Sequence, residues 1–149
     1  MIYFATDHRG YELKERLKAW LTEWGYEYED LGAKNHDEQD DYPDFVHAAA
    51  QKVSEKPAEN KAIILGASGQ GEAMAANRHI GVRAAVYYGG PHDVVALSRE
   101  HNDANVFSIG ASFVTEDEIK HVLKVWLITP FSHDERHVRR INKIDLHNE

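Results

Sequence analysis

Short apolar runs alternate with stretches of helical periodicity along the whole chain. Five of the runs have the length and composition of strands, and they lie at residues 2–6, 26–31, 62–65, 82–88 and 105–110. The second run carries alternating glutamates, which predicts a position near an edge of the sheet. Alternating strands and helices, without an internal repeat, predict one α/β domain over residues 1–149. Its parallel sheet is expected to be covered on both faces.

The predicted helices are bounded by capping residues. The first, over residues 13–24, has apolar positions at intervals of three and four, and Gly25 follows it as a C-cap. A later helix begins at Thr115, with Glu118 completing a capping box. The last helix is expected over residues 132 to about 147. Its inward-facing apolar residues are predicted to be Val138, Ile141 and Ile144.

The most informative stretch is a glycine-rich turn at residues 66–71, between a buried strand and an Ala-rich helix. The glycines allow a tight turn whose backbone N–H groups point at one spot, a nest for an anion or a developing oxyanion. Glu72 can reach the same spot, and a base beside a row of donors suits proton transfer next to a carbonyl. The alternatives are an ordinary strand–turn–helix connection and a glutamate favoured by the helix dipole.

Other polar residues lie at the ends of the predicted strands. Asp7 and His8 follow the first strand, and ligands of parallel sheets bind outside the carboxyl ends of the strands, where the glycine turn also lies. Capping of a loop is the alternative role for this pair. His101 and Asn102 precede the fifth strand, so we expect them at the opposite end of the sheet. Only a second subunit would bring them to the same site.

Basic residues gather in the last helix of an otherwise acidic chain. Arg136 and Arg140 are four residues apart and share a helix face, and paired guanidinium groups suit a phosphate. A solvated basic face is the alternative. His133 and His137 are also four residues apart, but no third ligand is placed by the sequence, so no metal site is predicted.

Composition narrows the classes of function. The formal net charge of −8 disfavours nucleic acid and anionic membranes as partners. The absence of cysteine excludes disulfides, thiolate nucleophiles and cysteine-based metal sites. The N-terminal run is too short for a signal peptide, and no apolar run approaches the length of a membrane span. We therefore expect a cytoplasmic protein.

Six short segments form an ordered set over nearly the whole chain, at residues 6–10, 41–43, 67–72, 75–78, 99–102 and 136–141. Together they resemble the type B ribose-5-phosphate isomerases and the related galactose-6-phosphate isomerase subunits. The resemblance implies an aldose–ketose isomerase of carbohydrate metabolism, without metal or cofactor. It also implies a Rossmann-like α/β/α sandwich with an extra C-terminal helix, and a homodimer or homotetramer whose sites are built from two subunits.

The resemblance also implies roles for the residues of the glycine turn. Glu72 would move a proton between C1 and C2 of the sugar through a cis-enediolate. Ser68 would hold the developing oxyanion together with the backbone of its neighbours, Ala67, Gly69, Gln70 and Gly71.

The remaining roles concern ring opening and the phosphate. Asp7 and His101 would open the sugar ring, and Asn102 would bind a substrate hydroxyl. Tyr42 would line the pocket. The residues implied at the phosphate end are His8, Arg136 and Arg140.

Two positions distinguish this chain within the resemblance. One branch of the family has a cysteine base where this chain has Gly66, so the glutamate branch is implied here. The family's usual phosphate-binding arginine is replaced by Ser112. The default substrate pair is ribose 5-phosphate and ribulose 5-phosphate. The alternatives are a tetrose or hexose phosphate, an unphosphorylated sugar, and a non-catalytic sugar-phosphate sensor or partner subunit. The glycine spacing disfavours a nucleotide-binding Rossmann domain.

Overall fold

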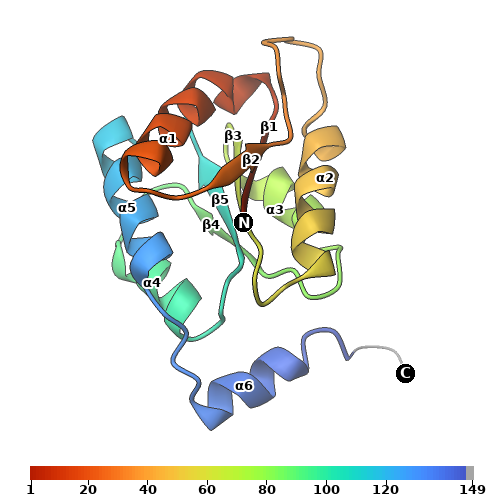
Figure 1. Ribbon diagram of the computed structural model, residues 1–149, viewed down its shortest axis with the longest axis vertical. Helices are drawn as coiled ribbons and strands as arrows, with labels where there is room; N and C mark the ends of the chain where they lie inside the picture. The colour runs from red at the N-terminus through yellow and green to blue at the C-terminus, as the bar shows by residue number, and fades with distance from the viewer. Residues whose placement is uncertain (147–149) are drawn as a thin grey trace.

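The computed structural model describes residues 1–146, which form an α/β/α sandwich around a five-stranded parallel sheet (Figure 1). The strands lie in the order β2-β1-β3-β5-β4. They are β1 (Ile2–Thr6), β2 (Tyr28–Asp30), β3 (Lys61–Gly66), β4 (Ala84–Tyr87) and β5 (Val106–Gly110). The helices are η1 (His8–Gly10), α1 (Tyr11–Glu23), α2 (Tyr42–Glu55), α3 (Gln70–Ala76), α4 (Asp93–Glu100), α5 (Glu116–Ile128) and α6 (Glu135–Asn142). The predicted fold class is confirmed.

The two faces of the sheet are buried by different helices. Phe4, Leu65 and Phe107 point to one face, where they pack against α1, α4 and α5. Their neighbours along the same strands, such as Ala5 and Ile64, point to the other face and pack against α2 and α3. This alternation follows from the two-residue period of a strand. Figure 1 shows α1, α4 and α5 on one side of the sheet and α2 and α3 on the other.

The capping predictions for the first and fifth long helices are confirmed in part. Gly25 follows α1 with φ of 83°, the left-handed conformation expected of a residue after a helix. Thr115 caps α5 by accepting a hydrogen bond from the Glu118 N–H at 3.2 Å. The reciprocal half of the capping box is also supported, because hydrogen bonds from the Tyr87 hydroxyl, at 2.5 Å, and from the backbone of Thr115 lower the pKa of the Glu118 carboxyl.

The last helix differs most from its prediction. It spans Glu135–Asn142 rather than residues 132 to 147, and position 147 lies outside the described residues. Val138 and Ile144 are 36% and 47% exposed, not buried, and His137 is the buried side chain of α6. The reason is that α6 lies beyond the amino ends of the strands, past the core of the sandwich (Figure 1). Val138 and Ile144 therefore face outward in a single chain, whereas Ile141 is half-buried.

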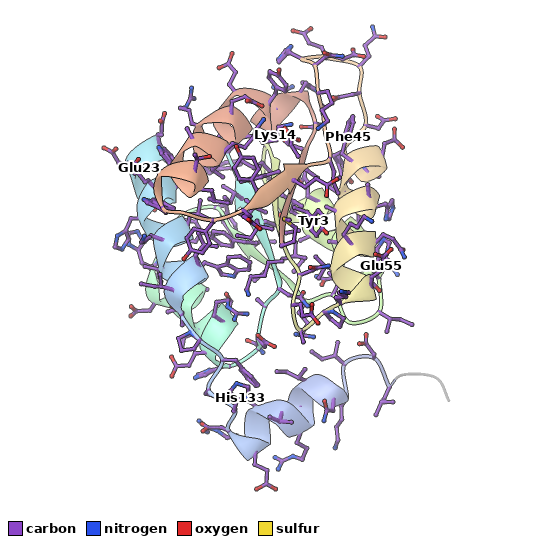
Figure 2. The ribbon with its side chains drawn as sticks, in the orientation of Figure 1. Tyr3, Lys14, Glu23, Phe45, Glu55 and His133 are labelled. Atoms are coloured by element: carbon purple, nitrogen blue, oxygen red, sulfur yellow. The ribbon has the colours of Figure 1, made fainter. Side chains whose placement is uncertain are left out.

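Lys14 of α1 is completely buried and fixes the start of the loop that joins β2 to α2 (Figure 2). Its ammonium donates to Asp30 Oδ1 at 2.8 Å and to the Ala33 carbonyl at 2.5 Å. Asp30 in turn accepts from the Gly32 N–H at 3.0 Å. Burial lowers the pKa of Lys14, whereas its contact with Asp30 opposes that shift. This network holds residues 32–33 against β1 and so sets the course of the loop toward the carboxyl ends of the strands.

No helix in residues 1–146 is both long and apolar enough to cross a lipid bilayer.

Candidate active site

The glycine-rich turn connects the carboxyl end of β3 to α3 and is held in place by β5. Gly69 adopts φ of 75°, a conformation that favours glycine. Its carbonyl accepts from the Ser108 hydroxyl at 2.6 Å. The Ala111 N–H donates to the Gly66 carbonyl at 2.8 Å, and the Ser112 N–H donates to the Ala67 carbonyl at 3.1 Å. The backbone of the turn is therefore fixed before any ligand arrives.

Glu72 lies in the first turn of α3 and is only 4% exposed. Its carboxylate rests against the backbone of Gly66, because a Cβ added there would lie 1.8 Å from Glu72 Oε1. Burial raises the pKa of the Glu72 carboxyl, and the nearby Asp7 charge raises it further, against an opposing hydrogen bond from the backbone N–H. A buried carboxylate of this kind is a stronger base than one in water.

Asp7 is brought beside Glu72 by strand pairing. β1 pairs with β3 so that Thr6 lies opposite Leu65, and the Thr6 hydroxyl donates to the Leu65 carbonyl at 2.8 Å. Asp7 is 7% exposed and accepts from the Arg9 N–H at 2.9 Å as the N-cap of η1. The capping role that the sequence left open is thus present. Asp7 therefore caps η1 and also lies next to the buried carboxylate of Glu72.

Two further predicted residues lie at the same edge of the sheet. The Tyr42 hydroxyl, at the start of α2, lies against Gly71, where an added Cβ would be 2.4 Å from the phenolic oxygen. Ser68 Oγ accepts from the Gln70 N–H at 3.3 Å. Since the first N–H groups of a helix lack intrahelical acceptors, the turn and the start of α3 present donors at this edge.

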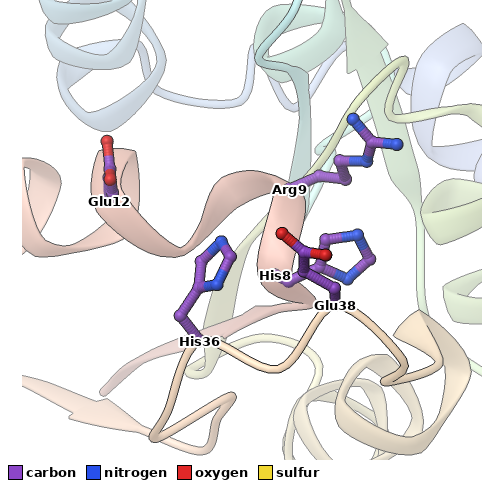
Figure 3. Close-up of a pocket in the computed structure, with 5 residues that line it drawn as sticks. All are labelled: His8, Arg9, Glu12, His36 and Glu38. Carbon is purple, nitrogen blue, oxygen red and sulfur yellow. The ribbon is translucent and has the colours of Figure 1, made fainter.

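His8 opens onto a cavity of about 470 Å³. Figure 3 shows that its wall is formed by η1, by α1 and by the loop between β2 and α2. The residues that line it are His8, Arg9, Glu12, His36 and Glu38. His8 follows Asp7 directly, so this cavity adjoins the buried carboxylates of Asp7 and Glu72.

Four predicted site residues lie elsewhere, as the strand order requires. His101 caps the end of α4, and its ring packs on His137 with centroids 4.3 Å apart. Asn102 follows it and is exposed. Arg136 and Arg140 are exposed on α6. All four lie beyond the amino ends of the strands (Figure 1). For His101 and Asn102 this confirms the expected separation from Glu72 within one chain.

Groups that could ligate a metal gather in one place within residues 1–146. Single ligand atoms of Asp7, His8 and Asp40 lie within 4.8 Å of one another. Hydrogen bonds within the protein already engage each of these side chains, so the cluster does not by itself identify a metal centre. His133 precedes α6 and His137 lies within it, so the two do not share a helix face (Figure 2).

Sequence reasoning missed Asp40. It lies 32 positions from His8, yet one of its oxygens contacts both the backbone and the ring of that residue. A contact across such a separation leaves no local pattern, and the run of acidic residues around position 40 reads as an ordinary polar loop. The neighbouring segment at residues 41–43 was the only available signal.

Comparison with known proteins gives a consistent result. A family model described as Ribose/Galactose Isomerase matches residues 2–144. Ribose-5-phosphate isomerase B of Mycobacterium tuberculosis is 40% identical over 141 residues, which cover 95% of this chain and 85% of that protein. The crystal structure of ribose-5-phosphate isomerase B from Mycoplasma genitalium, with bound ribulose-5-phosphate, superposes with a TM-score of 0.91. It is 36% identical, and the match covers 96% of this chain and 92% of that one. The type B ribose 5-phosphate isomerase of Trypanosoma cruzi gives a TM-score of 0.88 at 37% identity, over 97% of this chain and 95% of that one.

Proposed function

Because this chain belongs to the ribose/galactose isomerase family, we propose that it interconverts ribose 5-phosphate and ribulose 5-phosphate with Glu72 as the base. The chain is an aldose–ketose isomerase. The assignment of Glu72 as the base rests on one observation, the burial of its carboxylate against Gly66, next to Asp7 and the glycine turn. The choice of sugar rests on relatives named for ribose 5-phosphate and on the ribulose-5-phosphate bound to the Mycoplasma genitalium enzyme.

The proposed chemistry is a proton transfer between neighbouring carbons. Glu72 removes the proton from C2 of the open-chain aldose, and the carbonyl oxygen on C1 gains negative charge as a cis-enediolate forms. Glu72 then returns a proton to C1, while a proton moves from the C2 hydroxyl to O1, and the C2 carbonyl of the ketose results. The raised pKa of Glu72 suits removal of a weakly acidic proton. In this proposal Ser68 and the backbone N–H groups at residues 69–71 stabilise the oxyanion.

The other predicted residues complete the proposal. Asp7 and His101 assist opening of the sugar ring, Asn102 binds a hydroxyl, and Tyr42 lines the pocket. The phosphate is held by His8, Arg136 and Arg140. Two arginines on one helix can each donate bidentate hydrogen bonds to a phosphate.

We propose that each site is shared between two subunits of a homodimer or homotetramer. His101 and the two arginines lie at the wrong end of the sheet to meet Glu72 of their own chain. The edge strand β4 is only partly buried, which leaves a surface for a second copy. Exposed apolar side chains lie near this edge, on α3, on α4 and in the turn between α3 and β4, and they include Met74, Ile80, Val94 and Leu97. A self-complementary apolar surface is typical of a twofold interface.

Isomerisation in heavy water, followed by NMR, tests the proposed reaction. We expect deuterium at C1 or C2 of ribulose 5-phosphate or ribose 5-phosphate, because a base that exchanges with solvent returns deuterium instead of the original proton. Four-, five- and six-carbon sugars, each with and without a terminal phosphate, serve as comparisons. Exchange confined to another sugar would reassign the substrate and would give Ser112 a role in that change.

The same experiment addresses the non-catalytic alternative. Ser112 is exposed at the carboxyl edge of the sheet, where it supplies no positive charge. Loss of one charge-assisted contact to a phosphate costs about 1.5–3 kcal/mol. If the protein binds a sugar phosphate but no sugar exchanges a proton, the isomerase mechanism is overturned and a sensor or partner subunit takes its place.

Mixing two inactive variants tests the shared site. Glu72→Gln and His101→Asn should each be nearly inactive as homodimers. After subunit exchange, half of the dimers are mixed, and each holds one site free of both substitutions, so activity should recover to about a quarter of the wild-type value. The two single variants, each put through the same exchange alone, are the controls. No recovery in verified mixed dimers would place the whole site within one chain.

A further inference from the structure

Asp40 is an acidic residue with a buried side chain, to which the proposed chemistry gives no role. It is the penultimate residue of the loop between β2 and α2, and its side chain is 8% exposed. Its Oδ1 atom accepts from the His8 backbone N–H at 3.1 Å and contacts His8 Nδ1 at 2.6 Å. One oxygen therefore holds both the backbone and the ring of His8.

This contact decides which nitrogen of His8 faces a ligand. A carboxylate oxygen 2.6 Å from Nδ1 is an acceptor, so Nδ1 carries a hydrogen and is fully occupied. Nε2 is then the nitrogen left for a ligand in the cavity that His8 lines (Figure 3). The neighbouring His36 ring lies nearly perpendicular to the His8 ring, with centroids 6.1 Å apart.

His8 is the main electrostatic partner of Asp40, because the second carboxylate oxygen of Asp40 has no partner in the described residues. Asp40 Oδ2 is buried and has no hydrogen-bond partner among the described residues. No lysine or arginine in residues 1–146 forms an ion pair with Asp40, whereas His8 does. A carboxylate that gives up water on one oxygen loses solvation, and a charge-assisted hydrogen bond at the other offsets that loss.

The charges around the cavity make the orientation of His8 important for a phosphate. Glu12 and Glu38 line the same cavity and repel a phosphate, and among the described residues Arg9 is the one arginine that lines it. With Nδ1–H donating to Asp40, Nε2 is the nitrogen through which the ring can meet a phosphate oxygen, and a hydrogen on Nε2 makes it a donor there. A ring turned away from Asp40 loses the contact that directs Nε2 toward the ligand.

We propose that Asp40 is a positioning residue for substrate recognition, which fixes His8 so that Nε2–H faces the phosphate end of the sugar. The inference rests on the proposed function and deepens it. Asp40 acts through His8, and the Nδ1 contact is the step on which its effect depends.

Asp40→Asn tests this role, because it removes the charge but keeps the size of the side chain. We expect the KM for ribose 5-phosphate to rise about tenfold, with kcat changed less than about twofold, since one charge-assisted contact is weakened far from the reacting carbons. The Ki of inorganic phosphate as a competitive inhibitor should rise in parallel. Asp37→Asn is the matched control, because Asp37 is an exposed aspartate of the same loop whose Oδ1 accepts from the Gln39 N–H, and asparagine keeps that acceptor.

An NMR measurement on the imidazole nitrogens separates positioning from a general loss of structure. In wild type, His8 Nδ1 should be protonated, with its hydrogen shifted strongly downfield by the short contact, and the shift should shrink in Asp40→Asn but not in Asp37→Asn. Two results would overturn this inference but not the proposed function. In the first, the wild type is active and both substitutions change KM equally; in the second, His8 Nδ1 is unprotonated in the wild type. A wild type that isomerises no sugar phosphate would overturn the proposed function and this inference together.

Discussion

Replacing Glu72 with glutamine should lower kcat by about 10²–10⁴-fold, because a positioned general base contributes rate of that order. Glutamine has nearly the same shape, so the fold and the binding of the sugar should change little. The measurement is kcat for ribose 5-phosphate, together with the rate of deuterium uptake in heavy water. Glu59→Gln is the control, because Glu59 is an exposed carboxylate remote from the site. Turnover within about tenfold of wild type would remove Glu72 from the chemistry.

The same variant should be more stable than wild type at neutral pH. The folded-state pKa of Glu72 is raised above its usual value of 4.5, so ionisation at higher pH costs more in the folded protein than in the unfolded chain. Glutamine removes that cost, and the melting temperature should rise at pH 8. Below pH 4.5 glutamate is protonated in both states, and the difference should disappear. A variant less stable than wild type at pH 8 would argue against a raised pKa of Glu72 in the folded protein.

Gly66→Ala should lower kcat/KM by at least about 10²-fold, although it adds a single methyl group to a residue that takes no part in the reaction. The new Cβ would lie 1.8 Å from Glu72 Oε1 and 2.1 Å from Cδ, so the carboxylate must move away. A displacement of about 1 Å at a reacting group costs about 10²-fold. The protein should still fold, because the end of a side chain moves and the backbone does not. Circular dichroism checks the fold, and steady-state kinetics with ribose 5-phosphate gives the effect.

A double variant identifies the cause of that loss. If Gly66→Ala acts by displacing Glu72, then Gly66→Ala combined with Glu72→Gln should be no slower than Glu72→Gln alone. Two residues that act as a unit give such non-additive effects. Effects that multiply would show instead that Gly66 serves the site in another way, for example through the backbone of the turn.

Local patterns were sufficient where the cause is local. The strands β1, β3 and β5 are apolar runs that are buried on both faces, so their sequence and their environment agree. The placement of Glu72 beside the glycine turn follows from strand–turn–helix connectivity, and Asp7 follows from the pairing of adjacent parallel strands.

Patterns were insufficient where distant residues or other surfaces decide. Lys14 occupies an apolar-facing position of α1, and only its contacts with Asp30 and Ala33 explain a buried ammonium. Asp40 depends on His8 in the same way. The exposure of Val138 has a third cause. Helical periodicity shows that one face of a helix is apolar, but it does not show whether the core of the same chain covers that face.

The contact between Gly66 and Glu72 also constrains how this enzyme can change over evolutionary time. Any side chain at position 66 would occupy the space that the Glu72 carboxylate fills now. A reactive side chain at position 66 is therefore incompatible with a carboxylate packed there from position 72. A change at position 66 first displaces the existing base, and a change at position 72 first removes it. Either order passes through a poorly active protein. The two positions therefore form an epistatic pair, and a lineage that has settled on glutamate is expected to keep its glycine.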